Sequence, residues 1–213
     1  MLVKDVMTKN PFTVENKASI LEAKDIMSKK KINKLPVLNK AGQLVGILTS
    51  NDLDRVTPSE ATTLDIYEMG YLLSKLNVEK VMTKKPITVS QNETVEEAAR
   101  IMADHDFGCL PVMDGKKLVG IITDSDLFKM FIEMFNARTP GIRAILTLKD
   151  EPGKLSQLSK LLGDATAQII SCVTTAAENP DYRKVTIKVT GITLSRFKEI
   201  AETCGKVDDI RKV

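Results

Sequence analysis

Two copies of one short pattern hold the residues of this chain that could do chemistry. Gly46 to Leu53 reads GILTSNDL, and Gly120 to Leu127 reads GIITDSDL. In each copy a threonine precedes an aspartate by three residues, where an apolar run that predicts a strand gives way to a predicted helix. The free N–H groups and the dipole at a helix start suit an anionic or phosphate-bearing ligand. The threonine hydroxyl can bind phosphate, and the carboxylate can accept hydrogen bonds from two hydroxyls of a ribose.

The same spacing also has a purely structural explanation. Thr-x-x-Asp has the shape of a helix capping box with aspartate in the place of glutamate. A single isolated copy favours the cap, because motifs this short recur by chance. Two copies on one repeated frame favour a ligand site, and both interpretations stay open from the sequence alone.

The frame itself is written twice. Residues 6–53 align with residues 81–127, and the second copy lacks one residue in a turn. Each copy predicts a short extended piece, a helix, a strand, a Gly-containing turn, a second strand and a second helix. The repeating unit is therefore β-α-β-β-α, and two such small units could stack into one core.

Capping-box spacing opens the first helix of each copy, at Ser19-x-x-Glu22 and at Thr94-x-x-Glu97. The apolar stripes of these helices consist of Ile20, Ala23, Ile26 and Met27 in the first copy and Val95, Ala98, Ile101 and Met102 in the second. Between the copies, residues 57–80 predict a helical insertion of about three turns.

Composition excludes several classes of function. The net charge of +3 is too mild, and the lysines too dispersed, for a nucleic-acid binder. The single histidine, His105, leaves no His-dependent triad or multi-His metal site within one subunit. Three scattered cysteines without CxxC spacing favour reduced thiols and a cytoplasmic location. No apolar run approaches the length of a membrane span, and the N-terminus has no signal-peptide pattern, so we expect neither a membrane partner nor export.

The pattern changes after Asn136. Residues 141–213 predict the order β-α-β-β-α-β, a split-βαβ or ferredoxin-like arrangement. The predicted buried stripes of its two helices are Leu155, Leu158, Leu161 and Leu162 in the first and Phe197, Ile200 and Ala201 in the second, which ends at Gly205. The predicted fold class is α/β (α+β), with two stacked β-α-β-β-α repeats followed by a βαββαβ domain. The predicted domains are 1–56 (first repeat), 57–80 (insertion), 81–136 (second repeat), 137–140 (linker) and 141–213 (C-terminal domain).

Residues 1–136 resemble a tandem pair of CBS domains, a Bateman module. The resemblance rests on the repeated VMT, LPV and GI(L/I)TxxDL segments and covers both copies in full. It implies two CBS repeats related by a pseudo-twofold axis, with a cleft that binds adenosine-containing ligands: AMP, ADP or ATP, and in some members NAD or S-adenosylmethionine. It also implies that Asp52 and Asp126 hold the ribose, while phosphate or ribose is contacted by Thr49, Thr123, Asn51 and Ser125.

The same resemblance implies a crossed arrangement, in which each site combines one copy with the segment before the first strand of the other. Site 1 then consists of Thr49, Asn51, Asp52, Thr83, Lys85, Ile87 and Thr88. Site 2 consists of Thr123, Ser125, Asp126, Thr8, Asn10, Phe12 and Thr13. Backbone near Leu35 and Cys109 would close the two pockets, with Cys109 as a small buried residue beside the adenine.

Charge distinguishes the two predicted sites. Asp124 adds a second carboxylate to site 2, so we expect that site to prefer adenosine with little phosphate or to need Mg²⁺. Ser50 and Asn51 leave site 1 neutral, with Lys34 and Lys85 nearby in sequence, so we expect site 1 to tolerate phosphate better.

Residues 141–213 resemble an ACT domain, on the marks DEPGKL after the first predicted strand and AQIIS at the second. The resemblance implies edge-to-edge pairing of two chains, and therefore a homodimer. It also implies a candidate amino-acid site at Asp150, Pro152, Gly153, Leu155 and Gln168. Gln168 stands where the family often has asparagine, and Gly153 could serve only the strand-to-helix turn, so a ligand-free dimerisation domain is an equal alternative. The combination of both resemblances is similar to the bacterial AcuB-type acetoin-utilisation proteins.

These observations predict a cytoplasmic regulatory protein that is not an enzyme. We expect an adenosine-containing small molecule as ligand, no cofactor apart from Mg²⁺ accompanying phosphates, and a regulated partner protein that the sequence does not identify. A ligand-free interaction scaffold is the alternative. A nucleotide-processing enzyme ranks below both, because the sequence has no nucleophile–base pair and no Gly-rich Walker loop.

Overall fold

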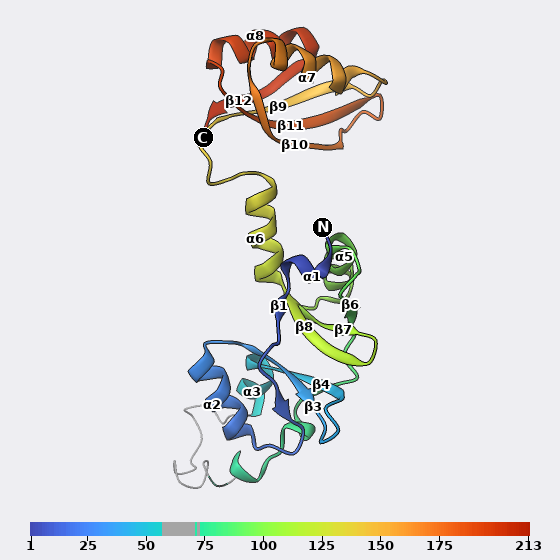
Figure 1. Ribbon diagram of the computed structural model, residues 1–213, viewed down its shortest axis with the longest axis vertical. Coiled ribbons are helices and arrows are strands. Elements are labelled where there is room, and N and C mark those ends of the chain that lie inside the picture. Colours follow the sequence, from blue (N-terminus) through green and yellow to red (C-terminus); the bar gives the residue numbers. More distant parts are fainter. Residues whose placement is uncertain (57–70, 72) are drawn as a thin grey trace. The chain divides into compact units, whose positions relative to one another are not determined.

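The computed structural model describes residues 1–56, 71 and 73–213. The predicted helical insertion at 57–80 falls largely on residues 57–70 and 72, which lie outside the described residues. The chain divides into two compact units, Met1–Leu127 and Phe128–Val213, and their elements are labelled in Figure 1. The sequence assigned residues up to 136 to the second repeat, whereas the contacts place the division after Leu127.

The first unit contains the two repeats. The first repeat consists of α1 (Val3–Val6), β1 (Thr8–Lys9), β2 (Val14–Glu15), α2 (Ile20–Lys30), β3 (Lys34–Leu38), β4 (Leu44–Thr49) and α3 (Ser50–Val56). The second consists of the 3₁₀ turn η1 (Val78–Lys80), β5 (Thr83–Lys84), β6 (Val89–Ser90), α5 (Val95–His105), β7 (Cys109–Asp114), β8 (Lys117–Thr123) and α6 (Asp124–Met134), which continues into the second unit. The predicted β-α-β-β-α order is confirmed from β2 to α3 and from β6 to α6. A helical turn and a two-residue strand precede it in each copy, and the sequence pattern did not predict them.

The predicted caps open the first helix of each repeat. The Ser19 hydroxyl accepts a hydrogen bond from the Glu22 N–H at 3.2 Å, and the Thr94 hydroxyl accepts one from the Glu97 N–H at 3.2 Å. The buried positions of α2 and α5 are Ile20, Ala23, Met27, Val95, Ala98 and Met102, while Ile26 and Ile101 are half-buried. The apolar stripes therefore pack as their helical spacing predicts.

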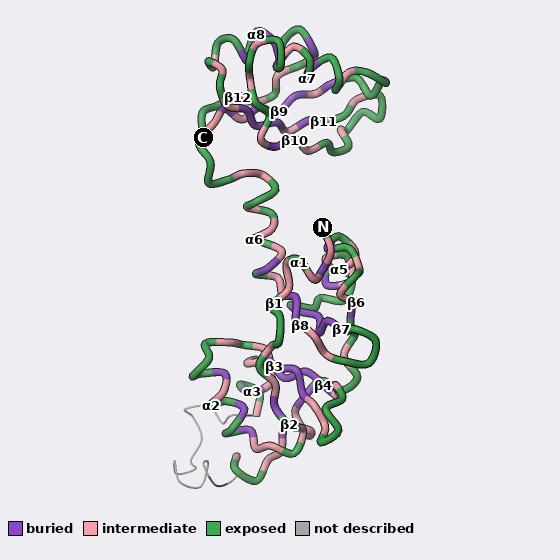
Figure 2. The backbone as a smooth tube through the Cα atoms, viewed as in Figure 1, coloured by how far each residue is buried: buried purple, intermediate pink, exposed green. Residues whose placement is uncertain are grey.

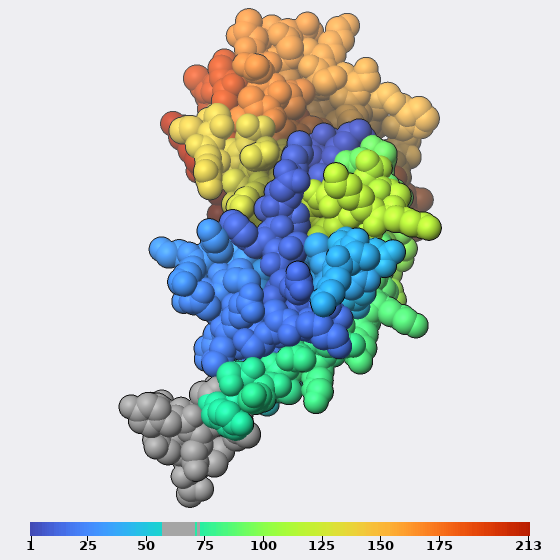
Figure 3. All heavy atoms as spheres, turned by 60° about the horizontal axis from the view of Figure 1, so that its bottom comes forward, coloured from blue at the N-terminus to red at the C-terminus, as the bar shows by residue number. Residues whose placement is uncertain are grey.

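The two repeats are joined by an exchange of short strands. β1 of the first repeat pairs with β8 of the second, and β5 of the second pairs with β4 of the first. The resulting sheets have the orders β1-β8-β7-β6 and β2-β3-β4-β5. In Figure 3 the N-terminal segment, in dark blue, runs over the surface between lighter blue atoms of the first repeat and yellow-green atoms of the second. Each repeat thus contributes a short strand to the sheet of the other, while the crossed assignment of the site residues stays a prediction.

Each exchanged strand lies against a glycine of its partner strand. A Cβ atom added to Gly46 would collide with the Met82 Sδ and lie 3.0 Å from the Thr83 carbonyl oxygen. The same geometry recurs at Gly120, where an added Cβ would collide with the Met7 Sδ. The repeated glycine therefore permits the close approach of two backbones.

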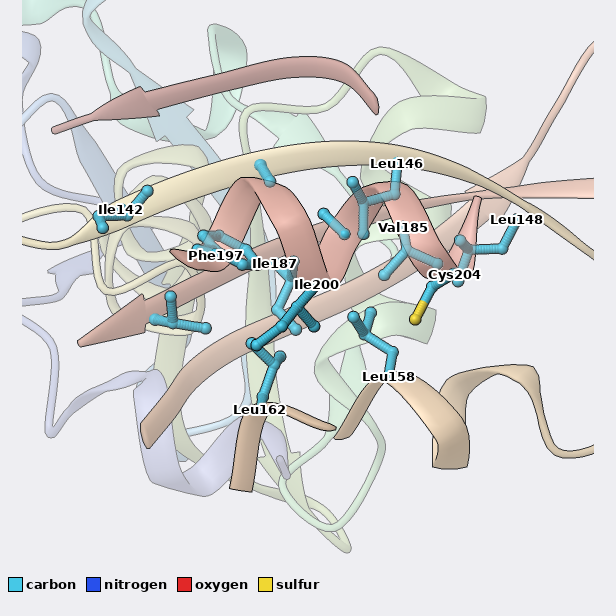
Figure 4. Packing of buried hydrophobic residues seen from close by; sticks show 13 residues of the cluster. Ile142, Leu146, Leu148, Leu158, Leu162, Val185, Ile187, Phe197, Ile200 and Cys204 are labelled. Atoms are coloured by element: carbon cyan, nitrogen blue, oxygen red, sulfur yellow. The ribbon is translucent and has the colours of Figure 1, made fainter. Parts of the chain in front are cut away.

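The second unit is a four-stranded antiparallel sheet with two helices packed on one face. Its elements are β9 (Ile142–Lys149), α7 (Lys154–Asp164), β10 (Gln168–Ala176), β11 (Tyr182–Thr190), α8 (Leu194–Cys204) and β12 (Lys206–Lys212). The sheet order β10-β11-β9-β12 and the chain order βαββαβ confirm the predicted ferredoxin-like arrangement. Buried residues concentrate on the central strands β9 and β11 (Figure 2). Their side chains meet those of α7 and α8 in the cluster of Figure 4, in which Phe197 is fully buried.

Two details of this unit differ from the prediction. Leu155 is 42% exposed and does not belong to the buried cluster, so the buried stripe of α7 starts one turn later, at Leu158. Gly205 follows α8 as predicted, but with a φ of 174° it is extended and not left-handed. Glycine fits there because an added Cβ would lie 2.6 Å from the Thr147 carbonyl oxygen.

Replacing Gly46 with alanine tests the strand exchange. We expect the free energy of unfolding to fall by about 1–3 kcal/mol, because the added methyl group overpacks against Met82 and the Thr83 backbone. Equilibrium urea denaturation measures the change. Gly163→Ala is the control, since Gly163 lies in α7 with nothing within 4 Å of an added Cβ, and it should raise stability by up to about 1 kcal/mol. A Gly46→Ala protein as stable as the wild type would contradict this account of the glycine.

Candidate functional site

The repeated Thr–Asp pair has the same geometry in both copies. Asp52 Oδ2 accepts hydrogen bonds from the Thr49 N–H at 2.9 Å and from the Thr49 hydroxyl at 2.7 Å. Asp126 Oδ2 accepts the equivalent bonds from Thr123 at 3.0 and 2.7 Å. The N–H of each aspartate donates back to the threonine Oγ1, at 3.3 Å in the first copy and 3.4 Å in the second. The capping alternative is therefore realised at both helix starts.

Capping and ligand binding are compatible at these pairs. The cap bonds of each pair use a single carboxylate oxygen, whereas an ionised carboxylate offers about four acceptor positions. Asp126 is 8% exposed and Asp52 is half-buried. The threonine bonds hold each aspartate in one orientation, and a side chain held in this way is preorganised to receive a ligand.

The first of the two pairs lies at a cavity of about 420 Å³ that both repeats line. The first repeat supplies Asn33, Lys34, Ile47, Thr49, Ser50 and Asn51, and the second supplies Thr83, Pro86, Ile87, Asp106, Phe107, Gly108, Cys109, Pro111 and Asp124. The residues predicted for site 1 that line it are Thr49, Asn51, Thr83 and Ile87. Asp52, Lys85 and Thr88 are not among the lining residues, although Asp52 is hydrogen-bonded to Thr49, which is. The volume is that of a typical small-molecule pocket.

An ion pair joins the two repeats at this cavity. Lys34 Nζ lies 3.0 Å from Asp124 Oδ1 and donates a hydrogen bond to the Gly108 carbonyl oxygen at 2.6 Å. Burial alone would raise the pKa of Asp124. The hydrogen bonds from Lys34 and from the Ser125 N–H, together with the lysine charge, outweigh burial and hold that pKa below its usual value.

The sequence placed Asp124 at site 2, whereas the structure places it at the cavity that holds the residues of site 1. Asp124 lines the cavity of site 1, and its N–H donates to the Gly108 carbonyl oxygen at 3.2 Å. Residues two apart on a helix face different directions, so Asp124 does not follow Asp126. The cavity is lined by one ammonium, that of Lys34, and by two carboxylates, those of Asp106 and Asp124, and therefore not by neutral groups alone as the sequence led us to expect.

Cys109 is the small buried residue that the sequence predicted at the pocket. It is 9% exposed, and burial raises the pKa of its thiol to about 11, although the Lys34 charge acts in the opposite direction. A thiol with this pKa is protonated near neutral pH and reacts slowly. Cys109 therefore presents an uncharged wall to the cavity, and its contact with an adenine stays a prediction.

One of the residues predicted for site 2, Thr8, lies on the exchanged strand β1. β1 and β8 place Thr8 opposite Ile121, two residues before Thr123. Phe12 is exposed, and Lys30 Nζ lies 4.7 Å from the centroid of its ring. The strand exchange thus places β1 beside β8, while the grouping of the site 2 residues and their ligand roles stay predictions.

Sequence reasoning missed part of the site 1 cavity. Pro86 and Pro111 line it, and so do residues 106–108. The alignment of the two copies could have indicated the prolines, since they match Pro11 and Pro36 of the first copy. The alignment could not have indicated residues 106–108, because they have no identical counterpart in the other repeat.

Of the residues predicted for an amino-acid site, Gln168 lies apart from the loop that contains Asp150, Pro152 and Gly153. Asp150 accepts two hydrogen bonds from Arg183, at 3.1 and 3.0 Å, and these bonds hold the pKa of Asp150 below its usual value. Gly153 precedes α7 with a φ of 88°, in the turn that joins strand to helix. Gln168 begins β10 opposite Thr190, at the other end of the sheet from Asp150. A site that uses the 150–153 loop and Gln168 together would need a second chain.

The part of the chain that the structure describes has neither a candidate metal site nor a membrane-spanning helix. There, no three His, Cys, Asp or Glu side chains are grouped so as to hold a metal ion. The helices of the same part all lack the combination of length and apolar character that crossing a membrane needs.

Two β-α-β-β-α repeats that exchange strands and share a cleft define a class of paired-repeat modules. The family model of the CBS domain matches residues 3–58 and 78–133, more than half of the chain. The chain belongs to the CBS-domain family. The match covers both repeats and leaves residues 134–213 outside it.

Several known proteins are similar to the repeat region. L-aspartate semialdehyde sulfurtransferase of Methanocaldococcus jannaschii is 34% identical over 131 residues, which are 61% of this chain but 23% of that protein. The CBS domain pair of protein MJ0100, solved in complex with 5′-methylthioadenosine and S-adenosyl-L-methionine, is 31% identical with a TM-score of 0.52, over 65% of this chain and 98% of that one. CBSX2 in complex with AMP is 31% identical with a TM-score of 0.50, over 62% and 96%. A protein of Vibrio cholerae described as an acetoin utilization protein, AcuB, is 29% identical with a TM-score of 0.54, over 65% and 95%.

A double-mutant cycle tests the ion pair at the cavity. With Lys34→Met, Asp124→Asn and the double variant, we expect a coupling free energy of about 0.2–1 kcal/mol at pH 7, as for other ion pairs with exposed members. Folding lowers the pKa of Asp124, so its contribution is present above its ordinary pKa of 3.8 and is lost as the pH falls through the folded value. Urea denaturation at pH 7 and pH 2 measures both. Coupling that persists undiminished at pH 2 would mean that the contact is not ionic.

Proposed function

We propose that this protein is a non-catalytic regulatory protein whose paired repeats bind an adenosine-containing ligand. The observation that carries the proposal is the cavity at which Thr49 of one repeat, bonded to Asp52, meets the exchanged strand of the other repeat. Similar structures were solved with 5′-methylthioadenosine, S-adenosyl-L-methionine and AMP, which share an adenosine group. An enzyme name occurs among the relatives, but the matched region is about a quarter of that protein, which suits a regulatory module attached to a separate catalytic part.

The cavity offers a complementary surface to each part of an adenosine. Asp52, held by Thr49, can accept hydrogen bonds from ribose hydroxyls. Ile47, Ile87 and Cys109 supply apolar surface against which a purine ring would be buried. Residues of both repeats would then contact one ligand, and this is the arrangement that lets a ligand report on how the repeats are placed.

The ion pair between Lys34 and Asp124 affects which chemical group the ligand can have at its 5′ position. A phosphate would have to take Lys34 from Asp124 or lie beside the carboxylate, and like charges in a partly buried site repel. A neutral thioether or a cationic sulfonium has no such cost. Site 1 would therefore prefer adenosine ligands without phosphate, the reverse of the expectation from sequence, and Mg²⁺ would be needed to place a phosphate beside Asp124.

The second unit is proposed to be an ACT domain through which two chains pair. Its βαββαβ order supports this, and so does β10, an edge strand of nine residues that pairs with β11 alone among the described strands. An edge strand with unpaired N–H and C=O groups can add a strand from a second copy. Such a pair would also be required for the amino-acid site, because one chain keeps the 150–153 loop and Gln168 apart.

Regulation would work as a population shift. A ligand that contacts both repeats favours the arrangement in which their contributions to the cavity meet, by as much as its affinities for the two arrangements differ. α6 begins at the cavity with Asp124 and leads the chain into the second unit, so it is the element that would transmit the change. The likeness to AcuB supports acetoin utilisation as a context for the regulated partner.

Asp52→Asn and Asp126→Asn test the ribose contacts of the two sites. The amide keeps an acceptor for the threonine bonds but loses the charge, so we expect the affinity for 5′-methylthioadenosine to fall about tenfold with little change in stability. Isothermal titration calorimetry on the full chain measures it. Asp54→Asn, an exposed aspartate of the same helix as Asp52, is the matched control and should bind as the wild type does. A wild-type protein that binds neither 5′-methylthioadenosine, S-adenosylmethionine, AMP, ADP nor ATP would favour the ligand-free scaffold.

Asp124→Asn tests the charge preference of site 1. A neutral amide leaves Lys34 available to a phosphate, so we expect the affinity for AMP relative to 5′-methylthioadenosine to rise about tenfold. Lys34→Met should lower the affinity for AMP in the same titration. If the ratio of the two affinities is the same in wild type and Asp124→Asn, the charge argument fails while the adenosine site itself stands.

A further inference from the structure

A row of cations crosses the sheet of the second unit. Lys188 on β11 lies opposite Ser171 on β10 and opposite Arg143 on β9, and Arg143 in turn lies opposite Arg211 on β12. The core residues of β9 and β11 alternate with these positions, so the row lies on the face away from the buried cluster. Like charges directly opposite one another on a sheet are destabilising. The row therefore needs a compensating anion.

The carboxylate of Asp209 does not meet this need. Asp209 accepts hydrogen bonds from Arg211 at 2.9 and 2.6 Å and lies 3.7 Å from Arg143 Nη1, so two guanidinium groups share it. Lys188 is 4% exposed, and its ammonium donates to the Asn136 carbonyl oxygen at 2.9 Å. Within the described residues it forms no ion pair with a carboxylate. A buried ammonium without an anionic partner is a costly group.

Two of these cations, Arg143 and Lys188, line a cavity of about 320 Å³ between the sheet and the end of α6. Arg143, Ser171 and Lys188 form its polar side. Phe131 and Phe135 form an apolar side, with their ring centroids 4.5 Å apart. The cavity thus has a cationic wall and an aromatic wall within reach of one small molecule.

Ser171 is a second indication of a bound ligand, and it does not depend on the charges of Lys188 and Arg143. It is 8% exposed, and its hydroxyl finds no hydrogen-bond partner among the described residues. Leaving a buried hydroxyl unpaired costs free energy, and such groups in folded proteins are usually satisfied. Because Ser171 lines the cavity beside Lys188, a bound acceptor would satisfy both groups.

We propose that this cavity is a binding site for a small organic carboxylate with an apolar body. The carboxylate accepts hydrogen bonds from Lys188 and Ser171 and is attracted by Arg143, while the apolar body packs on Phe131 and Phe135. An inorganic anion would leave the aromatic wall uncovered. The site is separate from the 150–153 loop and does not depend on the adenosine cleft.

Lys188 also has a simpler role, which is to hold the turn after α6. Its ammonium binds the Asn136 carbonyl oxygen, and the Asn136 side chain donates to the Ile170 carbonyl oxygen at 2.5 Å. These bonds account for the position of Lys188. These bonds do not explain the unpaired Ser171 hydroxyl or the excess of cations in the row.

Titration of the full chain with sodium phenylacetate, sodium acetate and inorganic phosphate tests the site by calorimetry. We expect phenylacetate to bind more tightly than either of the others. Lys188→Met should weaken phenylacetate binding about tenfold or more, and Ser171→Ala severalfold, as for a charged and a neutral hydrogen bond. Lys184→Met is the matched control, because Lys184 is exposed on the same strand and the same face, and its affinity should equal that of the wild type.

Phe131→Ala keeps the test decisive if Lys188→Met does not fold, since Phe131 is exposed and its loss should spare the fold. This variant should weaken phenylacetate and leave acetate unchanged. Absence of phenylacetate binding at millimolar concentration overturns the proposal. Phosphate binding as tight as that of phenylacetate overturns the organic class of ligand. Unchanged phenylacetate affinity in both Ser171→Ala and Phe131→Ala places the binding elsewhere and overturns it as well.

Discussion

The first unit depends on the exchange of two strands that are only two residues long. Without it, each repeat would have a three-stranded sheet with an open edge next to β4 or β8. The exchange is sterically allowed because Gly46 and Gly120 have no Cβ where Met82 and Met7 cross them. It also builds the site, because it carries Thr83 of one repeat to Thr49 of the other. The repeated Gly-apolar-apolar-Thr-x-x-Asp segment therefore joins a packing requirement, a helix cap and one wall of a cavity within eight residues.

The sequence predicted the features that local physics controls. Helix caps at Ser19 and Thr94, the apolar stripes and the order of elements follow from spacing along a few turns of chain, and the structure has them. The strands β1 and β5 were not predicted, since two residues show no periodicity and their partners lie far away in sequence. Asp124 was misplaced for a related reason. Its charge was visible, but the cavity that it faces depends on the helix face it occupies and on Lys34, ninety residues away in the chain.

Two lysines at cavities illustrate how a charge can indicate ligand chemistry. Lys34 has a carboxylate partner in Asp124, and Asp106 adds a second carboxylate to the lining, so this cavity gains little from a further anion. Lys188 has a backbone carbonyl as its partner and a second cation opposite it on the sheet, so its cavity gains from an anion. The two cavities accordingly suit different ligands, an adenosine without phosphate in the first unit and a carboxylate in the second. Net charge over the whole chain, +3, conceals this difference entirely.

Both lysines bind groups at the ends of one helix, α6. These contacts limit the ways in which a ligand could change the position of that helix. α6 begins with Asp124, which binds Lys34, and the turn after it contains Asn136, which binds Lys188. A ligand that takes either lysine as its own partner removes one of these restraints on α6. It can shift the position of the helix only by the difference between its affinities for the restrained and released states. Any such coupling must also be reciprocal, so a carboxylate that alters adenosine affinity must have its own affinity altered by the same factor.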